Sequence, residues 1–132
     1  MELTKSLLGE GKDVSLPARG NSMLPFIKNG KDRIVLRRLE GIKTGDMLLA
    51  RVSTGNYVIH RLIDIQGDRL TLKGDGNYRG VEYCSREDVS GTVIAIVSLR
   101  GRTRSPEFGK NWHKLPLFVR RPVIAVCKRI FR

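Results

Sequence analysis

Short apolar-rich segments recur through residues 33–97, and turns rich in Gly, Asp or Asn separate each segment from the next. The five segments are 33–37, 47–52, 57–63, 69–73 and 92–97. Such segments at intervals of roughly ten residues are typical of an antiparallel all-β body. We expect 57–63 and 69–73 to form a β-hairpin and 92–97 to be a central strand. The segments do not alternate with long helical patterns, which argues against a parallel βαβ sheet.

The chain of 132 residues is 40% hydrophobic and 29% charged, which is ordinary for one soluble globular domain. No apolar run approaches the roughly 18 residues of a membrane span, and the polar residues 1–14 do not resemble a secretory signal. Cys84 and Cys127 make neither a disulfide framework nor a metal-binding set. We therefore expect reduced thiols, no cofactor, no metal and a cytoplasmic location.

The net charge of +12 is concentrated near the end of the chain, because residues 101–132 hold nine basic residues and one acidic residue. We accordingly divide the chain into a β body, 1–100, and a basic tail, 101–132. A basic tail favours an anionic partner, either nucleic acid or an acidic membrane surface. Nucleic acid is the weaker choice, because aromatic residues make up only 6% and no strand offers a stacking platform.

Within the tail, residues 102–106 suggest a linker, and Pro122 suits the first turn of a helix. Four apolar residues after it share one helical face: Val123, Val126, Cys127 and Ile130. The basic residues Lys128, Arg129 and Arg132 lie off that face. Two interpretations stay open, namely a helix packed on the body with a solvated basic face, or peripheral attachment to a membrane.

The segment most suggestive of chemistry is 19–27, in which Ser22 lies between turn-forming residues and an apolar stretch. Alone, such a serine is usually a cap or a turn former. Further blocks follow it in order: Gly-Lys-Asp-Arg-Ile-Val-Leu at 30–36, Gly-Asp-Met-Leu-Leu-Ala at 45–50, Val-Ile-His-Arg-Leu-Ile at 58–63 and Lys-Gly-Asp-Gly-Asn at 73–77.

In this order, the blocks resemble the signal peptidase I and LexA-like superfamily of serine peptidases. The His-Arg pair and the 73–77 block are closest to its His-type branch, the endoplasmic-reticulum and archaeal signal peptidases. The resemblance runs over about residues 20–97. It implies a compact antiparallel coiled sheet or partly open barrel, and an endopeptidase that cuts a leader or propeptide of a polypeptide substrate. Membrane signal peptidases carry a transmembrane anchor, and we see none in this sequence.

The resemblance also implies roles for single residues: Ser22 is the nucleophile, His60 the general base and Asp75 the third member. The chemistry is reasonable, because a serine hydroxyl needs a neighbouring base, and an imidazole can serve near neutral pH. A carboxylate can hold the imidazole tautomer and stabilise the imidazolium. Glu82, at a looser spacing, is the alternative third member.

The oxyanion would be held by the backbone N–H of Ser22, in the turn opened by Gly20 and Asn21. Met23 and Pro25 would shape the floor beside the nucleophile, or else simply pack in the core. Some signal peptidases add a side-chain hydroxyl donor from the residue two positions before the nucleophile. In this sequence that position is Gly20, so it supplies no side-chain donor.

Each residue also has a plainer interpretation. A histidine within an apolar strand is usually a core residue, and an aspartate between glycines is usually a turn former. We expect Arg61 to be a solvated strand residue, with a salt bridge or a contact to a substrate carbonyl as the alternatives. We do not expect a catalytic role for His113. For the whole chain, the alternatives are an inactive or self-cleaving LexA-like regulatory module and a basic β-domain that binds nucleic acid.

Overall fold

The structure is a computed structural model, and it describes residues 1–18, 23, 26–28, 31–76, 80–109 and 111–130. The strands are β1 (Val14–Pro17), β2 (Asp32–Arg37), β3 (Met47–Arg51), β4 (Tyr57–Gln66), β5 (Arg69–Lys73), β6 (Glu82–Ser85), β7 (Val89–Ser98) and β8 (Thr103–Arg104). The helices are α1 (Glu2–Gly9), α2 (Leu117–Ile130) and three short 3-10 turns, Arg86–Asp88, Pro106–Gly109 and Trp112–Lys114.

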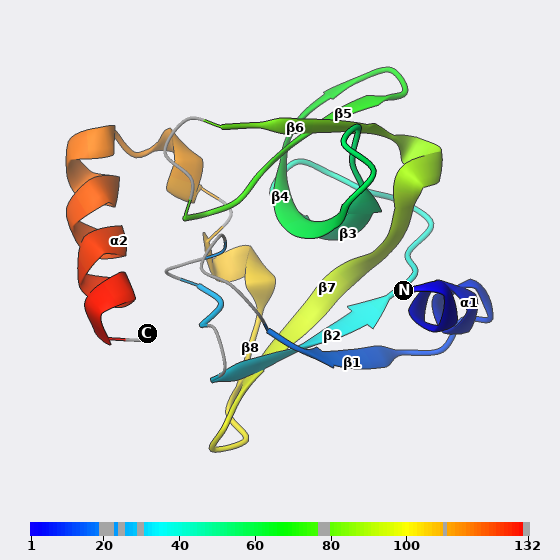
Figure 1. Cartoon of the computed structure of the whole chain (residues 1–132), viewed down its shortest axis with the longest axis horizontal. Helices are drawn as coiled ribbons and strands as arrows, with labels where there is room; N and C mark the ends of the chain where they lie inside the picture. Colours follow the sequence, from blue (N-terminus) through cyan, green and yellow to red (C-terminus); the bar gives the residue numbers. More distant parts are fainter. Residues whose placement is uncertain (19–22, 24–25, 29–30, 77–79, 110, 131–132) are drawn as a thin grey trace.

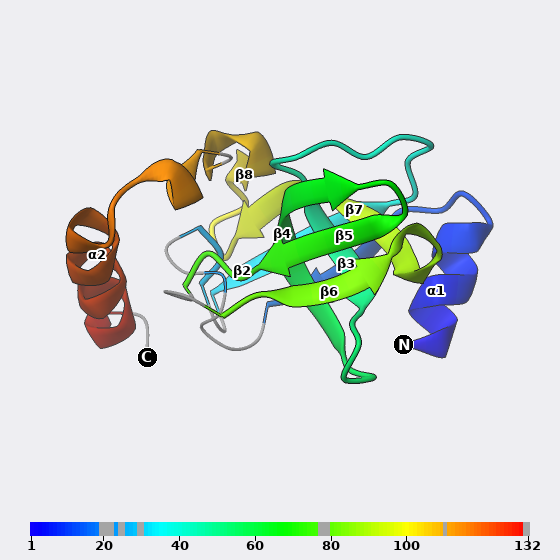
Figure 2. The ribbon, with the colours of Figure 1, turned by 90° about the horizontal axis from the view of Figure 1, so that it is seen from above.

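The strands form one curled antiparallel sheet in the order β1-β2-β7-β3-β4-β5-β6, with β8 paired to the end of β7 (Figure 1). The two main helices lie at opposite ends of this sheet, α1 beside β7 and α2 beyond the turns that follow β8 (Figure 2). The prediction of an all-β curled sheet with a short C-terminal helix is confirmed.

The five predicted strands correspond to β2, β3, β4, β5 and β7. The expected hairpin is β4–β5, whose turn contains Gly67 at a φ of 61°, a backbone conformation that glycine adopts without strain. Strand β7 is central, because it pairs with both β2 and β3. The sequence analysis missed β1, β6 and β8, which have four, four and two residues, and also missed α1.

Curling gives the sheet two apolar clusters with β3 between them. Met47 and Leu49 pack into a cluster with residues of α1, β2 and β7, while Leu48 and Ala50 pack into a second cluster with residues of β4, β5 and β6. Because successive residues of a strand point to opposite faces, a strand buried on both faces needs an unbroken apolar run. Residues 47–50 provide that run and hold β4, the next strand, in a fixed position.

The tail begins differently from our expectation. Residues 102–106 do not form a free linker, because Thr103 and Arg104 pair with β7. The Arg104 guanidinium also donates to the Phe26 carbonyl oxygen at 3.0 Å and to the Asp32 carboxylate at 2.9 Å. The division of the chain at residue 100 stays a prediction, but this segment is packed on the β body.

Helix α2 also differs from the expected one. It begins at Leu117, so Pro122 lies inside the helix rather than in its first turn. Among the α2 side chains that the structure describes, the buried ones are Arg120 and Ile124, one turn apart, whereas Val123 is 37% and Val126 is 55% exposed. Of the two interpretations of the apolar face, packing of Val123 and Val126 against the β body is therefore not what the structure has.

Candidate active site

His60 lies in the middle of β4, opposite Leu48 of β3, and its side chain is buried. Its Nδ1 atom lies 3.4 Å from Oε1 of Glu82, the first residue of β6. Burial lowers the pKa of His60 from its ordinary value of 6.5, and the charges of Glu82 and Asp75 oppose that shift without cancelling it. The imidazole is therefore neutral near pH 7 and can accept a proton.

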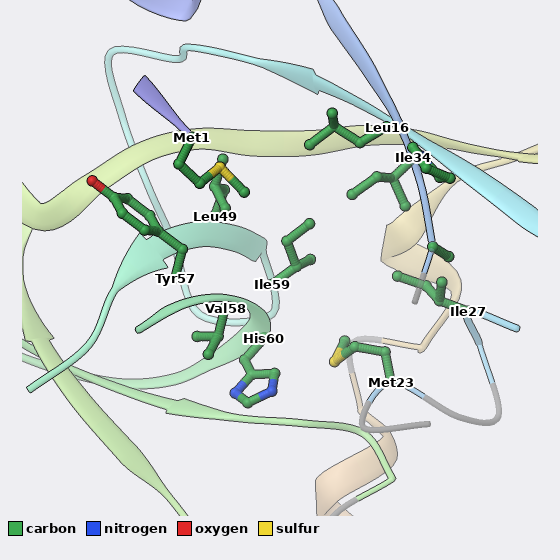
Figure 3. A pocket seen from close by; sticks show the side chains of 12 residues that line it. Met1, Leu16, Met23, Ile27, Ile34, Leu49, Tyr57, Val58, Ile59 and His60 are labelled. Carbon is green, nitrogen blue, oxygen red and sulfur yellow. The ribbon is translucent and has the colours of Figure 1, made fainter. Parts of the chain in front are cut away.

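A pocket of about 320 Å³ opens beside His60, and its lining is mainly apolar (Figure 3). Its side chains come from β1, β2, β3, β4 and the segment around residue 23; they include Leu16, Met23, Ile27, Ile34, Leu49 and Ile59. An apolar pocket with a few polar groups, here His60 and Tyr57, is the usual form of a small binding site in a protein.

Met23 brings the segment that precedes β2 to this pocket. Its side chain is buried in the first apolar cluster, and its carbonyl oxygen accepts from the N–H groups of Phe26 and Ile27 at 3.0 Å each. Its sulfur lies 3.3 Å from the backbone nitrogen of Asp75, in hydrogen-bonding geometry. Met23 is thus held between the pocket and the turn after β5.

Arg61, the residue after His60, is fully buried rather than solvated as we expected. Its guanidinium pairs with the Asp75 carboxylate through Nε, 2.9 Å from Oδ1, and Nη2, 2.7 Å from Oδ2. Nη1 donates to the carbonyl oxygens of Gly45 at 2.9 Å and Pro106 at 3.0 Å. The expectation failed because the tail folds back over this position, and the sequence of β4 gives no sign of that.

Asp75 is the centre of a buried polar cluster that joins the β body to the tail. Besides Arg61, its Oδ1 atom lies 3.0 Å from Nε2 of His113, and its carbonyl oxygen accepts from the indole N–H of Trp112 at 2.6 Å. Trp112 packs edge-on against Phe26, with ring centroids 5.5 Å apart. We name Arg61, Asp75 and His113 the buried charge cluster.

The structure brings three of the candidate residues into one region: His60, Asp75 and Met23. Ser22, Gly20, Asn21 and Pro25 lie outside the described residues, so the nucleophile and the oxyanion donors stay predictions. The assignment of Asp75 as third member also stays a prediction. Its carboxylate is hydrogen-bonded to Arg61 and His113, and Glu82 is the acid beside Nδ1 of His60.

Sequence reasoning did not find the part played by Arg61, Trp112 and His113. An arginine within an apolar strand was the one available signal, since a charged residue at a buried strand position requires a partner. The partners of Arg61 lie 14 to 45 positions away in the sequence, which no local pattern specifies.

A curled β-sheet with a neutral buried imidazole beside an apolar pocket is an arrangement suited to a peptidase or to a peptide-binding module. The Peptidase S24-like family model matches residues 1–97. The chain belongs to this family, and the match supports a peptidase or LexA-like module in general. No curated protein matches the chain.

Proposed function

We propose that the protein is a serine endopeptidase that cuts a leader or propeptide, with Ser22 as nucleophile and His60 as general base. The observation that carries the proposal is that His60 and Met23 line the same pocket. Met23 is the chain neighbour of Ser22, so its place in this pocket supports a serine on the same side of the pocket as the imidazole. A neutral imidazole is the form that such a base requires.

In the proposed reaction, His60 takes the hydroxyl proton of Ser22 as the oxygen attacks the carbonyl carbon of the scissile peptide bond. The tetrahedral oxyanion is stabilised by backbone N–H groups of the 20–22 turn. His60 then returns the proton to the leaving amine, and the C–N bond breaks. Water, activated by the same imidazole, hydrolyses the acyl-enzyme and releases the new carboxyl end.

We assign Glu82, rather than Asp75, to the orientation of the imidazole. Glu82 Oε1 lies beside Nδ1, where it can accept the Nδ1 proton and stabilise the imidazolium. The Asp75 carboxylate already faces two cationic or polar partners in the buried charge cluster. Its contribution is therefore to hold Arg61 and, through its backbone, Met23 in place, and to raise the pKa of His60 by its charge.

The pocket indicates the kind of peptide that would fit. An extended peptide can pair with an exposed strand edge through main-chain hydrogen bonds. The pockets that receive every second side chain of the peptide then determine, by their size and polarity, which peptides bind. The side chains that line this pocket are mainly aliphatic, so an apolar side chain next to the cleaved bond fits best.

The proposal is tested by incubating the full chain with a diverse peptide mixture and identifying new peptide ends by mass spectrometry. We expect cleavage next to apolar residues, and we expect Ser22→Ala to abolish it. Ser53→Ala removes the hydroxyl of an exposed serine in a turn and should leave cleavage unchanged. A serine-directed fluorophosphonate should label the wild type but not Ser22→Ala. If wild type neither cleaves nor reacts, the fold serves binding and the proposal is wrong.

The pH dependence tests Glu82 separately. Cleavage should fall as the pH drops through the pKa of His60, which burial holds below 6.5, because the protonated imidazole cannot act as base. In Glu82→Gln the carboxylate no longer raises that pKa, so the acid limb of the pH profile should move to lower pH and the plateau rate should fall. Glu87→Gln, at an exposed position of the same chain segment, should change neither. An unmoved acid limb in Glu82→Gln would contradict the assignment.

A further inference from the structure

Helix α2 presents an apolar face to solvent. Phe118 is 78% exposed and Val126 is 55% exposed, and Pro122 and Val123 between them are also exposed. Because residues three or four apart lie close together on a helix surface, these four form one stripe, which we name the α2 apolar face. The helix rests on the rest of the chain through its opposite side, where Arg120 and Ile124 are buried.

The anchoring of that opposite side is specific. Arg120 Nε donates to the Leu115 carbonyl oxygen at 2.9 Å, and its Nη1 lies 3.5 Å from Nδ1 of His113 in the buried charge cluster. The side of α2 that carries Arg120 and Ile124 therefore faces the rest of the chain, and the exposed α2 apolar face lies on the other side of the helix. Figure 1 shows the helix at the margin of the molecule, beyond the turns that follow β8.

The charge around the face has one sign. From residue 108 to the end of the chain there are seven Lys or Arg residues and no acidic residue. Arg121 and Arg129 are exposed on α2 itself. Long basic side chains beside an apolar stripe can reach the headgroups of a bilayer while the stripe enters the acyl boundary. None of the helices among the described residues is long and apolar enough to cross a membrane.

We infer that the α2 apolar face docks on the surface of an anionic phospholipid membrane. An uninterrupted positive charge fits a uniformly negative surface, whereas a protein groove is more commonly specified by charges of both signs. The attachment uses Phe118 and the valines for penetration and the arginines for headgroup attraction. It does not depend on peptidase activity, so its test and the peptide-cleavage test can fail independently.

The test is co-flotation of the full chain with vesicles of phosphatidylcholine alone or with about one-third phosphatidylglycerol. We expect binding to the anionic vesicles only, and weaker binding as salt is raised. Phe118→Ser combined with Val126→Ser should lower the partition coefficient about tenfold or more. Arg121→Gln and Arg129→Gln should lower it about fivefold each. Leu99→Ser, at an exposed leucine of the turn after β7, is the matched control and should leave it unchanged.

Three results would overturn the inference. The first is equal or no binding to the two kinds of vesicle. The second is the same partition coefficient for the Phe118→Ser/Val126→Ser variant and the wild type, with the fluorescence of the buried Trp112 confirming that both are folded. The third is a dimer in solution that Phe118→Ser dissociates, which would assign the face to a second copy of the chain.

Discussion

In His60→Ala, kcat/KM for the best peptide of the mixture should fall by about 10⁴-fold. The reason is that the Ser22 hydroxyl would have no group to take its proton, while the pocket and backbone donors would remain. A general base of this kind and the activated nucleophile act as one unit, so Ser22→Ala combined with His60→Ala should be little worse than either variant alone.

The second histidine of the chain provides the control. His113→Gln changes a side chain that contacts Asp75 and lies near Arg120, so kcat/KM should stay within about tenfold of wild type. Free imidazole added to His60→Ala should restore part of the rate, because it can occupy the space beside the pocket and accept the proton. A large loss in His113→Gln with little loss in His60→Ala would reverse the assignment of the base.

In Arg61→Met we expect a loss of about 3–5 kcal/mol in the free energy of unfolding. Methionine has a similar length but removes the cation, which would leave the fully buried Asp75 carboxylate without its bidentate partner. The carbonyl oxygens of Gly45 and Pro106 would also have no Arg61 donor. Urea unfolding, followed by the fluorescence of Trp112, measures the total loss of stability. Trp112 is a suitable reporter because its indole N–H donates to the Asp75 carbonyl oxygen.

Two further variants separate the buried charge from simple packing. Arg61→Met combined with Asp75→Asn should be more stable than Arg61→Met alone, because the uncompensated carboxylate is then absent. Arg37→Met breaks a bidentate pair with Asp13 that is exposed to solvent, so it should destabilise the protein much less than Arg61→Met does. A cost in Arg61→Met as small as that in Arg37→Met would contradict the importance of the cluster.

The stability of the buried charge cluster bears on the proposed function. Arg61 joins β4, the strand that carries His60, to the carbonyl oxygen of Pro106 in the tail. Asp75 binds Arg61 through its carboxylate and Met23 through its backbone nitrogen, so it connects β4 to Met23. Loss of the cluster would therefore loosen the two sides of the pocket relative to each other. A rate acceleration that depends on alignment is sensitive to shifts of about 1 Å, so Arg61→Met should also lower kcat under conditions where it is folded.

Much of the β body follows from local pattern. Segments 33–37, 47–52, 57–63, 69–73 and 92–97 correspond to β2, β3, β4, β5 and β7, because their apolar residues and flanking turns encode strand and turn at short range. The missed strands are short: β1 and β6 have four residues each and end the sheet, and β8 has two. Segments of that length contain too few residues for a period of two to stand out.

The sequence by itself determined the antiparallel β body, since turns and alternation are local properties of the chain. The resemblance of its ordered motifs to a known family suggested Ser22 and His60 as candidates, and their pairing stays a prediction. Only the tertiary structure decided which acid lies beside His60, that Arg61 is buried, and that α2 turns Phe118 outward. The first outcome depends on the pairing of β6 with β5, and the burial of Arg61 depends on the tail folding back over β4. Contacts between residues so far apart are selected by burial and by the pairing of charges in three dimensions.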